Sequence, residues 1–123
     1  MKKMLFLDDI RNPTDIYKDL NNEDFIIVRS FSEAVEYIMK NNFPDFISFD
    51  HDLGFSFEFS ESKTGYDFAK FLSDYIIDNN IDISKFKFKV HSANPVGSKN
   101  IECLMNNLID HINNKELKWV KFY

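Results

Sequence analysis

Short apolar runs, each followed at once by charged or histidine side chains, are the feature that most limits how this chain can fold. Runs such as residues 4–7 and 25–28 have the length of a strand that is buried on both faces, which is typical of parallel sheets. Several of the segments between the runs repeat their apolar residues at the helical period. We predict strands at residues 3–8, 25–28, 45–50, 85–90 and 118–123, helices at residues 14–20, 30–42, 65–80 and from 98 onward, and an extended flap at residues 55–64.

Strands that alternate with helices predict an α/β fold with a parallel sheet and helices on both of its faces. Short connections and right-handed crossovers favour the strand order 2-1-3-4-5, which is a three-layer, flavodoxin-like arrangement. A chain of 123 residues is long enough for a single core, so we expect one domain over residues 1–123.

The charge and the cysteine content exclude several classes of protein. A formal net charge of −5 argues against an extended nucleic-acid surface, which needs a positive field, but it permits a nucleotide in a small pocket. The single cysteine, Cys103, excludes an internal disulfide and fits a reducing compartment, and its neighbours predict a buried position. We find neither a signal-peptide pattern nor an apolar run of membrane-spanning length, and therefore expect a cytoplasmic protein that makes no membrane contact.

Carboxylates follow the first and third predicted strands, which are neighbours in this strand order. Asp8, Asp9 and Asp50 would then share the crevice at the switch point of the sheet, where α/β proteins bind their ligands. Their oxygens suit a divalent cation such as Mg²⁺, and crowded carboxylates without a cation would have raised pKa values. Each acid alone is also a plausible turn or capping residue. We predict a metal site formed by these three residues.

Two histidines flank the same crevice, because His51 follows the third predicted strand and His91 follows the fourth. Two imidazoles on opposite sides of a phosphodiester can open a cyclic phosphate, one by activating water and the other by protonating the leaving oxygen. A histidine at the end of a strand can equally be a structural hydrogen-bonding group. We predict a catalytic set of His51, His91 and Asp52, and the structural alternative stays open.

The segment after the fourth predicted strand leads straight into a helix. Backbone N–H groups at a helix start bind anions, so we predict that this segment holds phosphate oxygens through Asn94, Gly97, Ser98 and Asn100. Ser98 serves equally well as a plain helix cap. Arg11, two residues after the acid pair, is predicted either to clamp a phosphate or to form an ion pair with the acids.

These motifs resemble the receiver domains of response regulators. The resemblance rests on the acid pair after the first strand, on the segment 44–50 and on the dipeptide Ser92-Ala93. It implies metal-binding acids, a phosphoacceptor at Asp50 and a serine–alanine switch. Lys118 and Lys121 are the candidates for the receiver lysine, and the chain stops before the fifth helix of that fold.

A more specific resemblance is to the cyclic-phosphate processing receiver domain family, and it covers essentially the whole chain. Four motifs carry it: Leu7-Asp8-Asp9-x-Arg11-x-Pro13, Phe49-Asp50-His51-Asp52-Leu53-Gly54, Gly65-x-Asp67 and His91-Ser92-x-Asn94-Pro95-x-Gly97-x-x-Asn100. The resemblance implies a small protein with a receiver-like fold that acts on cyclic phosphates of nucleotides or RNA ends.

We expect metal-assisted hydrolysis of a cyclic phosphate on a nucleotide or RNA end, which would make the protein a phosphoesterase with Mg²⁺ as its cofactor. Two alternatives stay open at this point. One is a non-catalytic protein that binds a cyclic nucleotide or phosphate, and the other is a signalling receiver that is phosphorylated on Asp50.

Overall fold

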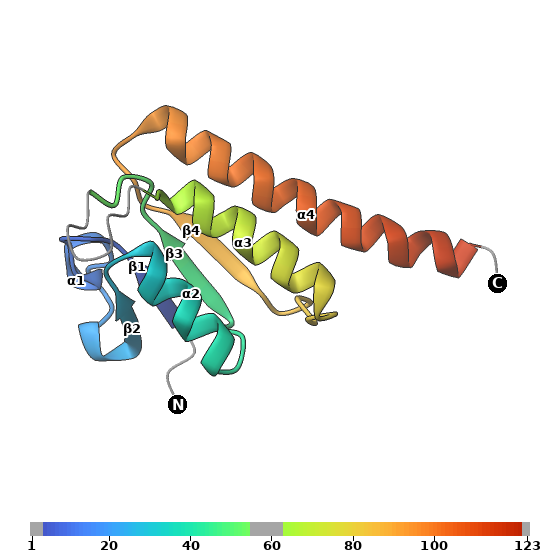
Figure 1. The fold of residues 1–123 in the computed structure, drawn as a ribbon, viewed down its shortest axis with the longest axis horizontal. Coiled ribbons are helices and arrows are strands. Elements are labelled where there is room, and N and C mark those ends of the chain that lie inside the picture. The colour runs from blue at the N-terminus through green and yellow to red at the C-terminus, as the bar shows by residue number, and fades with distance from the viewer. Residues whose placement is uncertain (1–3, 55–62, 122–123) are drawn as a thin grey trace.

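The computed structural model describes residues 4–54 and 63–121, with side chains described up to residue 114. The predicted flap at residues 55–64 therefore lies almost wholly outside the described residues. Strands and helices alternate along the chain, as predicted (Figure 1). The elements are β1 (Met4–Leu7), α1 (Pro13–Ile16), the short 3-10 helix η1 (Asn22–Asp24), β2 (Phe25–Val28), α2 (Phe31–Lys40), β3 (Phe46–Phe49), α3 (Gly65–Asp78), β4 (Lys87–Val90) and α4 (Pro95–Lys121).

The strands form one parallel sheet in the order β2-β1-β3-β4, which confirms the predicted order of the first four strands and the receiver-like α/β architecture. β1 pairs with β2 and β3, and β3 also pairs with β4. Because all four strands run the same way, the residues that follow β1, β3 and β4 meet at one edge of the sheet. We call this edge, formed by residues 8–11, 50–54 and 91–97, the carboxyl rim.

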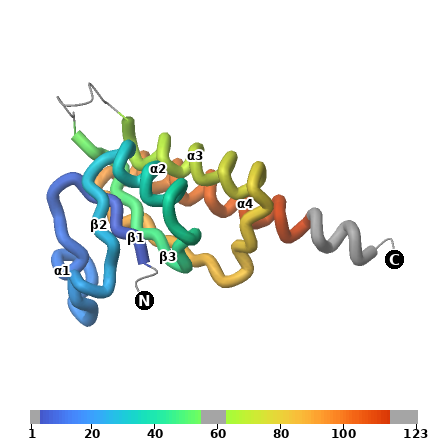
Figure 2. Tube along the Cα trace, turned by 60° about the horizontal axis from the view of Figure 1, so that its bottom comes forward, coloured from blue at the N-terminus to red at the C-terminus, as the bar shows by residue number. Residues whose placement is uncertain are grey.

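Three helices cover one face of the sheet, where α3 packs between α2 and α4 (Figures 1 and 2). Alternate strand residues, such as Leu5 and Leu7 on β1, are fully buried beneath these helices. Burial of each large apolar side chain contributes about 1.5–3 kcal/mol to stability. The helices supply Ala34, Ile38, Phe68, Ala69, Leu72, Ile76, Ile101, Met105 and Leu108 to this core.

The opposite face of the sheet carries a shorter helix than the one predicted at residues 14–20. The four-residue helix α1 lies on that side (Figure 2). Tyr17, which follows α1, stacks on Phe25 with ring centroids 5.9 Å apart and meets Phe46 edge-on at 6.3 Å. Rings therefore cover this face where a longer helix was expected.

The end of the chain differs from the prediction. Residues 118–121 belong to α4 instead of a fifth strand, and residues 122–123 lie outside the described part. The physical reason is local, because no glycine or proline follows Gly97 to end the helix and the segment 114–118 is rich in good helix formers. Cys103, expected in the core, is exposed on α4. No helix in the described ranges has both the length and the apolar character needed to cross a bilayer.

Candidate functional site

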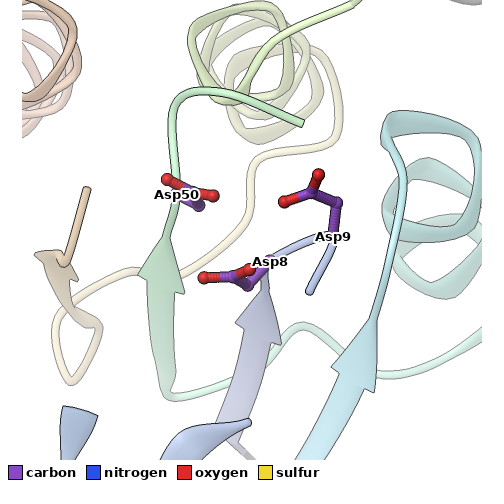
Figure 3. A group of neighbouring side chains, drawn as sticks. All are labelled: Asp8, Asp9 and Asp50. Atoms are coloured by element: carbon purple, nitrogen blue, oxygen red, sulfur yellow. The ribbon is translucent and has the colours of Figure 1, made fainter. Parts of the chain in front are cut away.

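Three carboxylates meet at the carboxyl rim. Asp8 and Asp9 follow β1, Asp50 follows β3, and the three side chains lie around one common space (Figure 3). One carboxylate oxygen from each lies within 4.8 Å of the others. The sequence placed these acids together through the adjacency of β1 and β3, and the structure has them there.

Asp8 is buried and fully hydrogen-bonded. Its Oδ1 accepts hydrogen bonds from the backbone N–H groups of Ile10 and Arg11, at 2.9 and 2.8 Å. Its Oδ2 accepts from Arg11 Nε at 2.8 Å and lies 3.0 Å from His91 Nε2. Burial would raise the pKa of Asp8, but these donors and the charge of Arg11 bring it below its usual value. Asp8 is therefore an ionised carboxylate whose four acceptor positions are all in use.

Asp9 and Asp50 have the opposite electrostatic character. Burial and the nearby charge of Asp8 raise the pKa of both side chains, and the positive charge of Arg11 offsets only part of that increase. Asp50 Oδ1 also accepts a hydrogen bond from the backbone N–H of His51 at 2.8 Å. Both carboxylates are thus under electrostatic strain that a further positive charge would relieve.

The donor set fits a divalent cation. Carboxylate oxygens are the ligands that Mg²⁺ prefers, and Asp9 and Asp50 have acceptor positions to spare. Asp8 contributes negative charge, but it can bind a cation directly only after it loses one of its four hydrogen bonds. The residues predicted to bind metal are therefore close enough to act together, although they are not equivalent.

Arg11 bridges two of these carboxylates. Its Nε lies 2.8 Å from Asp8 Oδ2 and its Nη2 lies 3.4 Å from Asp50 Oδ1, while a third of its side chain is exposed. Of the two predicted roles, the geometry therefore shows the ion pair with the acids. Its remaining N–H groups face no described partner and are available to an anion.

His91 is a buried member of a hydrogen-bonded chain. Its ring stacks on Phe6 with centroids 4.5 Å apart, and its side chain is 2% exposed. His91 Nδ1 lies 2.6 Å from Ser48 Oγ, which in turn lies 2.7 Å from the hydroxyl of Tyr17. Burial lowers the pKa of His91, although Asp8 offsets part of the change, so the ring is neutral at neutral pH.

Because Asp8 is ionised, the donor and the acceptor of each hydrogen bond in this series can be assigned. Since Asp8 can only accept, the neutral ring carries its proton on Nε2 and donates it to Asp8. His91 Nδ1 then accepts from Ser48, and Ser48 accepts from Tyr17. Burial raises the pKa of Tyr17, and the Ser48 contact offsets part of it, so Tyr17 keeps the hydroxyl proton that it donates. Sequence reasoning missed Ser48 and Tyr17; the signal was a serine within the apolar strand β3.

His51 and Asp52 form a second polar pair at the rim. His51 Nδ1 lies 2.8 Å from Asp52 Oδ1, and the His51 side chain is 18% exposed. The hydrogen bond from His51 lowers the pKa of Asp52, which is thus an acceptor. A neutral His51 therefore donates through Nδ1 and presents the lone pair of Nε2, for which the described residues provide no partner.

Two glycines permit this arrangement. A Cβ on Gly97 would lie 2.3 Å from Cγ of His51, so the bare glycine is what lets the imidazole rest on the first turn of α4. A Cβ on Gly65 would lie 1.8 Å from the backbone oxygen of Asp50. The first residue of α3 therefore lies directly against the segment that carries Asp50 and His51.

Backbone N–H groups at the start of α4 already donate to Asn94, which caps the helix. Asn94 Oδ1 accepts a hydrogen bond from Gly97 N at 3.0 Å, and the Asn94 carbonyl accepts from Ser98 N at 2.9 Å. The predicted cap at Ser98 is therefore wrong, because α4 begins three residues earlier, and Asn94 is the capping residue. Pro95 has no N–H group, and within residues 4–54 and 63–121 no hydrogen bond is made by the N–H of Val96.

Only some of the predicted phosphate-binding residues contact other residues of the carboxyl rim. Asn94 Nδ2 lies 3.4 Å from Asp52 Oδ1, and Gly97 touches His51, so both belong to the rim. The hydroxyl of Ser98 turns back to the carbonyl of Ser92 at 3.4 Å. Asn100 is exposed on α4, and no hydrogen bond among the described residues ties it to the rim.

Comparison with known proteins agrees with this fold. A solved structure described as amino acids 181–211 of the yeast Spc42 trimeric coiled coil in fusion with another structure is similar, with a TM-score of 0.54 and 24% sequence identity. The similarity covers 84% of this chain and 60% of that one, and at this identity it concerns the fold alone. No curated protein is a match for the chain. The profile of cyclic-phosphate processing receiver domains matches residues 3–107, and the chain therefore belongs to that family.

Proposed function

We propose that the protein binds a cyclic phosphate of a nucleotide or RNA end at the carboxyl rim and hydrolyses it to a phosphomonoester. The observation that carries the proposal is the pair of His51 and Asp52, with Nδ1 2.8 Å from Oδ1. A carboxylate that holds one ring nitrogen and leaves the other free is an arrangement suited to a general base. The family to which the chain belongs supports a cyclic phosphate as the ligand.

His51 acts on water in this proposal. Its Nε2 takes a proton from a water molecule while the water oxygen forms a bond to phosphorus. The bond between phosphorus and one ring oxygen breaks, and that oxygen is protonated by solvent to become a hydroxyl. His51 then loses its proton to solvent. The balance is one water added to one cyclic phosphodiester.

The negative charge of the carboxyl rim is the reason why the proposal includes a cation. Four aspartates lie at this edge, with the guanidinium groups of Arg11 and Arg29 beside them, so a phosphodiester anion meets excess negative charge. A divalent cation held by Asp9 and Asp50 would supply positive charge beside the phosphoryl oxygens. Arg11 offers its unused N–H groups to the same oxygens.

His91 and Asp52 act as positioning residues in this proposal. Both ring nitrogens of His91 are engaged, and its 2% exposed side chain has no open path to a substrate. Its contribution is to hold the carboxylate of Asp8 in place. Asp52 fixes which nitrogen of His51 carries the proton.

A phosphorylation switch is less well supported by the geometry. The candidate receiver lysines, Lys118 and Lys121, belong to the last turns of α4. Lys118 follows Pro95 by 23 residues, which corresponds to about 35 Å along a helix. Neither lysine is therefore positioned beside Asp50.

The proposal is tested by phosphorus NMR. Wild-type protein is incubated with 2′,3′-cyclic and 3′,5′-cyclic nucleotides and with RNA that ends in a cyclic phosphate, in Mg²⁺ or in EDTA. We expect conversion of at least one of these to a phosphomonoester in Mg²⁺. His51→Gln should lower the rate by about 100-fold or more, which is the contribution of a general base.

The matched control is His111→Gln, because His111 is exposed on α4 and distant in sequence from the rim motifs. It should keep the wild-type rate. Equal rates for His51→Gln and wild type would reject the role of His51. Tight binding with an intact ligand returned after long incubation would identify a non-catalytic binder instead.

A further inference from the structure

Arg11 supplies positive charge to two members of the carboxylate cluster, Asp8 and Asp50. Its guanidinium lies 2.8 Å from Asp8 Oδ2 and 3.4 Å from Asp50 Oδ1, and so contributes one positive charge between two aspartates. The same guanidinium is the group that the proposed function needs on the substrate phosphate. These two tasks draw on the same side chain.

Of the four hydrogen bonds that Asp8 accepts, only one can break without disturbing the fold when a cation binds. Oδ1 is held by two backbone N–H groups of the loop after β1, which cannot leave without unfolding that loop. Oδ2 is held by His91, which is buried and is fixed from its other side by Ser48. The fourth contact comes from Arg11, whose side chain is one-third exposed and can turn toward solvent.

The backbone of Arg11 is anchored independently of its side chain. Arg29 donates from Nη1 to the carbonyl of Arg11 at 2.5 Å and to the carbonyl of Asp8 at 3.3 Å. Arg29 Nη2 also reaches Asn12 Oδ1 at 2.5 Å. The loop therefore keeps its shape when the guanidinium of Arg11 moves, and the movement is confined to one side chain.

We propose that Arg11 and a divalent cation occupy the carboxylate cluster in turn, and that the guanidinium displaced by the cation binds the substrate phosphate. The exchange at the cluster needs no phosphate ligand and is argued from the contacts of Arg11 with Asp8 and Asp50. The second half rests on the proposed function, since it needs a phosphate ligand. The consequence is that cation and cyclic phosphate bind with positive cooperativity, and Arg11 is the side chain that couples them.

The first test is the binding of Mn²⁺, measured from the electron paramagnetic resonance of the free ion at neutral pH. Arg11→Gln should bind Mn²⁺ at least about tenfold more tightly than wild type, because no charge-assisted hydrogen bond must be broken. Lys40→Gln removes the same charge from an exposed ion pair on α2 and should match wild type. Equal or weaker binding by Arg11→Gln would overturn the exchange.

The second test separates displacement from simple charge repulsion. In wild-type protein, the Arg11 Nε–H proton is held by Asp8, so its NMR signal should exchange slowly with water. Saturating Mg²⁺ should make this exchange at least about tenfold faster, since the hydrogen bond is lost. Slow exchange retained in bound Mg²⁺ would show that the guanidinium stays in place and would refute the proposal.

The third test addresses the phosphate. A 2′,3′-cyclic nucleotide is titrated into His51→Gln, which should not hydrolyse it, with Mg²⁺ or with EDTA. We expect Mg²⁺ to tighten nucleotide binding, and the added substitution Arg11→Gln to remove most of that gain. A full gain retained without Arg11 contradicts the coupling. If no cyclic phosphate binds under any condition, the proposed function fails, whereas the Mn²⁺ and Nε–H results still decide the exchange.

Discussion

Gly97→Ala should separate the function of the rim from the stability of the fold. The added Cβ would lie 2.3 Å from Cγ, 2.6 Å from Cδ2 and 2.7 Å from Nδ1 of His51. An ordinary carbon contact is about 3.5 Å, so the imidazole must retreat by about 1 Å. It can do so because the neighbour is a side chain, unlike the backbone that faces Gly65.

The expected loss of activity follows from that displacement. A shift of about 1 Å in a group that acts on the substrate lowers the rate by about 100-fold. The helix itself should benefit, because alanine is about 0.5–1 kcal/mol better than glycine in a helix. Loss of the partly exposed pair of His51 and Asp52 removes at most about 1 kcal/mol. The melting temperature should therefore stay within about 4 °C of wild type.

The assay combines three measurements on Gly97→Ala. Turnover is followed by phosphorus NMR, stability by the melting curve of the far-ultraviolet circular dichroism, and the His51 ring by its nitrogen NMR signals. Lys99→Ala is the control, since it adds an alanine at an exposed position of the same helical turn. Undiminished turnover with a displaced ring would refute the role of His51, and an undisturbed ring would refute the packing on which the reasoning depends.

Three further changes test the surroundings of the rim. Gly65→Ala should lower the melting temperature sharply, because its Cβ would lie 1.8 Å from the backbone oxygen of Asp50, and a melting temperature equal to wild type would contradict the packing of α3. Ser48→Ala leaves His91 Nδ1 and the Tyr17 hydroxyl without their partner and should cost about 1–3 kcal/mol in denaturant unfolding, whereas a neutral effect would contradict the row of hydrogen bonds from Tyr17 to His91. Asp50→Asn should raise the melting temperature in EDTA at neutral pH, because burial and Asp8 raise the pKa of Asp50 and so make its ionised form destabilising. That gain should shrink as pH falls through the raised pKa toward 3.8, and a gain independent of pH would show that charge is not its cause.

The fold was largely accessible from local patterns. β2 was predicted with its observed bounds, and the limits of α2 and α3 lie within two residues of those predicted, because apolar period and capping residues are encoded locally. Ser30 accepts from Glu33 N, and Thr64 exchanges hydrogen bonds with Asp67 at the start of α3. The end of the chain was mispredicted because a lysine-rich run with scattered apolar residues suits an amphipathic helix as well as an edge strand.

The candidate site was accessible only in outline. Parallel strands bring Asp8, Asp50 and the two histidines to one edge, and that follows from strand order alone. Whether an imidazole is buried depends on packing across the sheet. The stacking of Phe6 on His91 could not be predicted from the sequence around either residue. The contact of Gly97 with His51 joins positions 46 residues apart, which local sequence patterns do not reveal. The sequence instead suggests that the backbone at Gly97 binds an anion, but its N–H group is bonded to Asn94 Oδ1.

Hydrolysis in water enriched in oxygen-18 tests the central claim most directly. If His51 activates a water molecule at the rim, the product phosphomonoester should carry one solvent oxygen on phosphorus, visible as an isotope shift of its phosphorus NMR signal. His111→Gln should give the same labelled product at the same rate, and His51→Gln should give very little of it. A cyclic phosphate that is bound and recovered unopened, or a labelled product formed equally well without His51, would contradict the account.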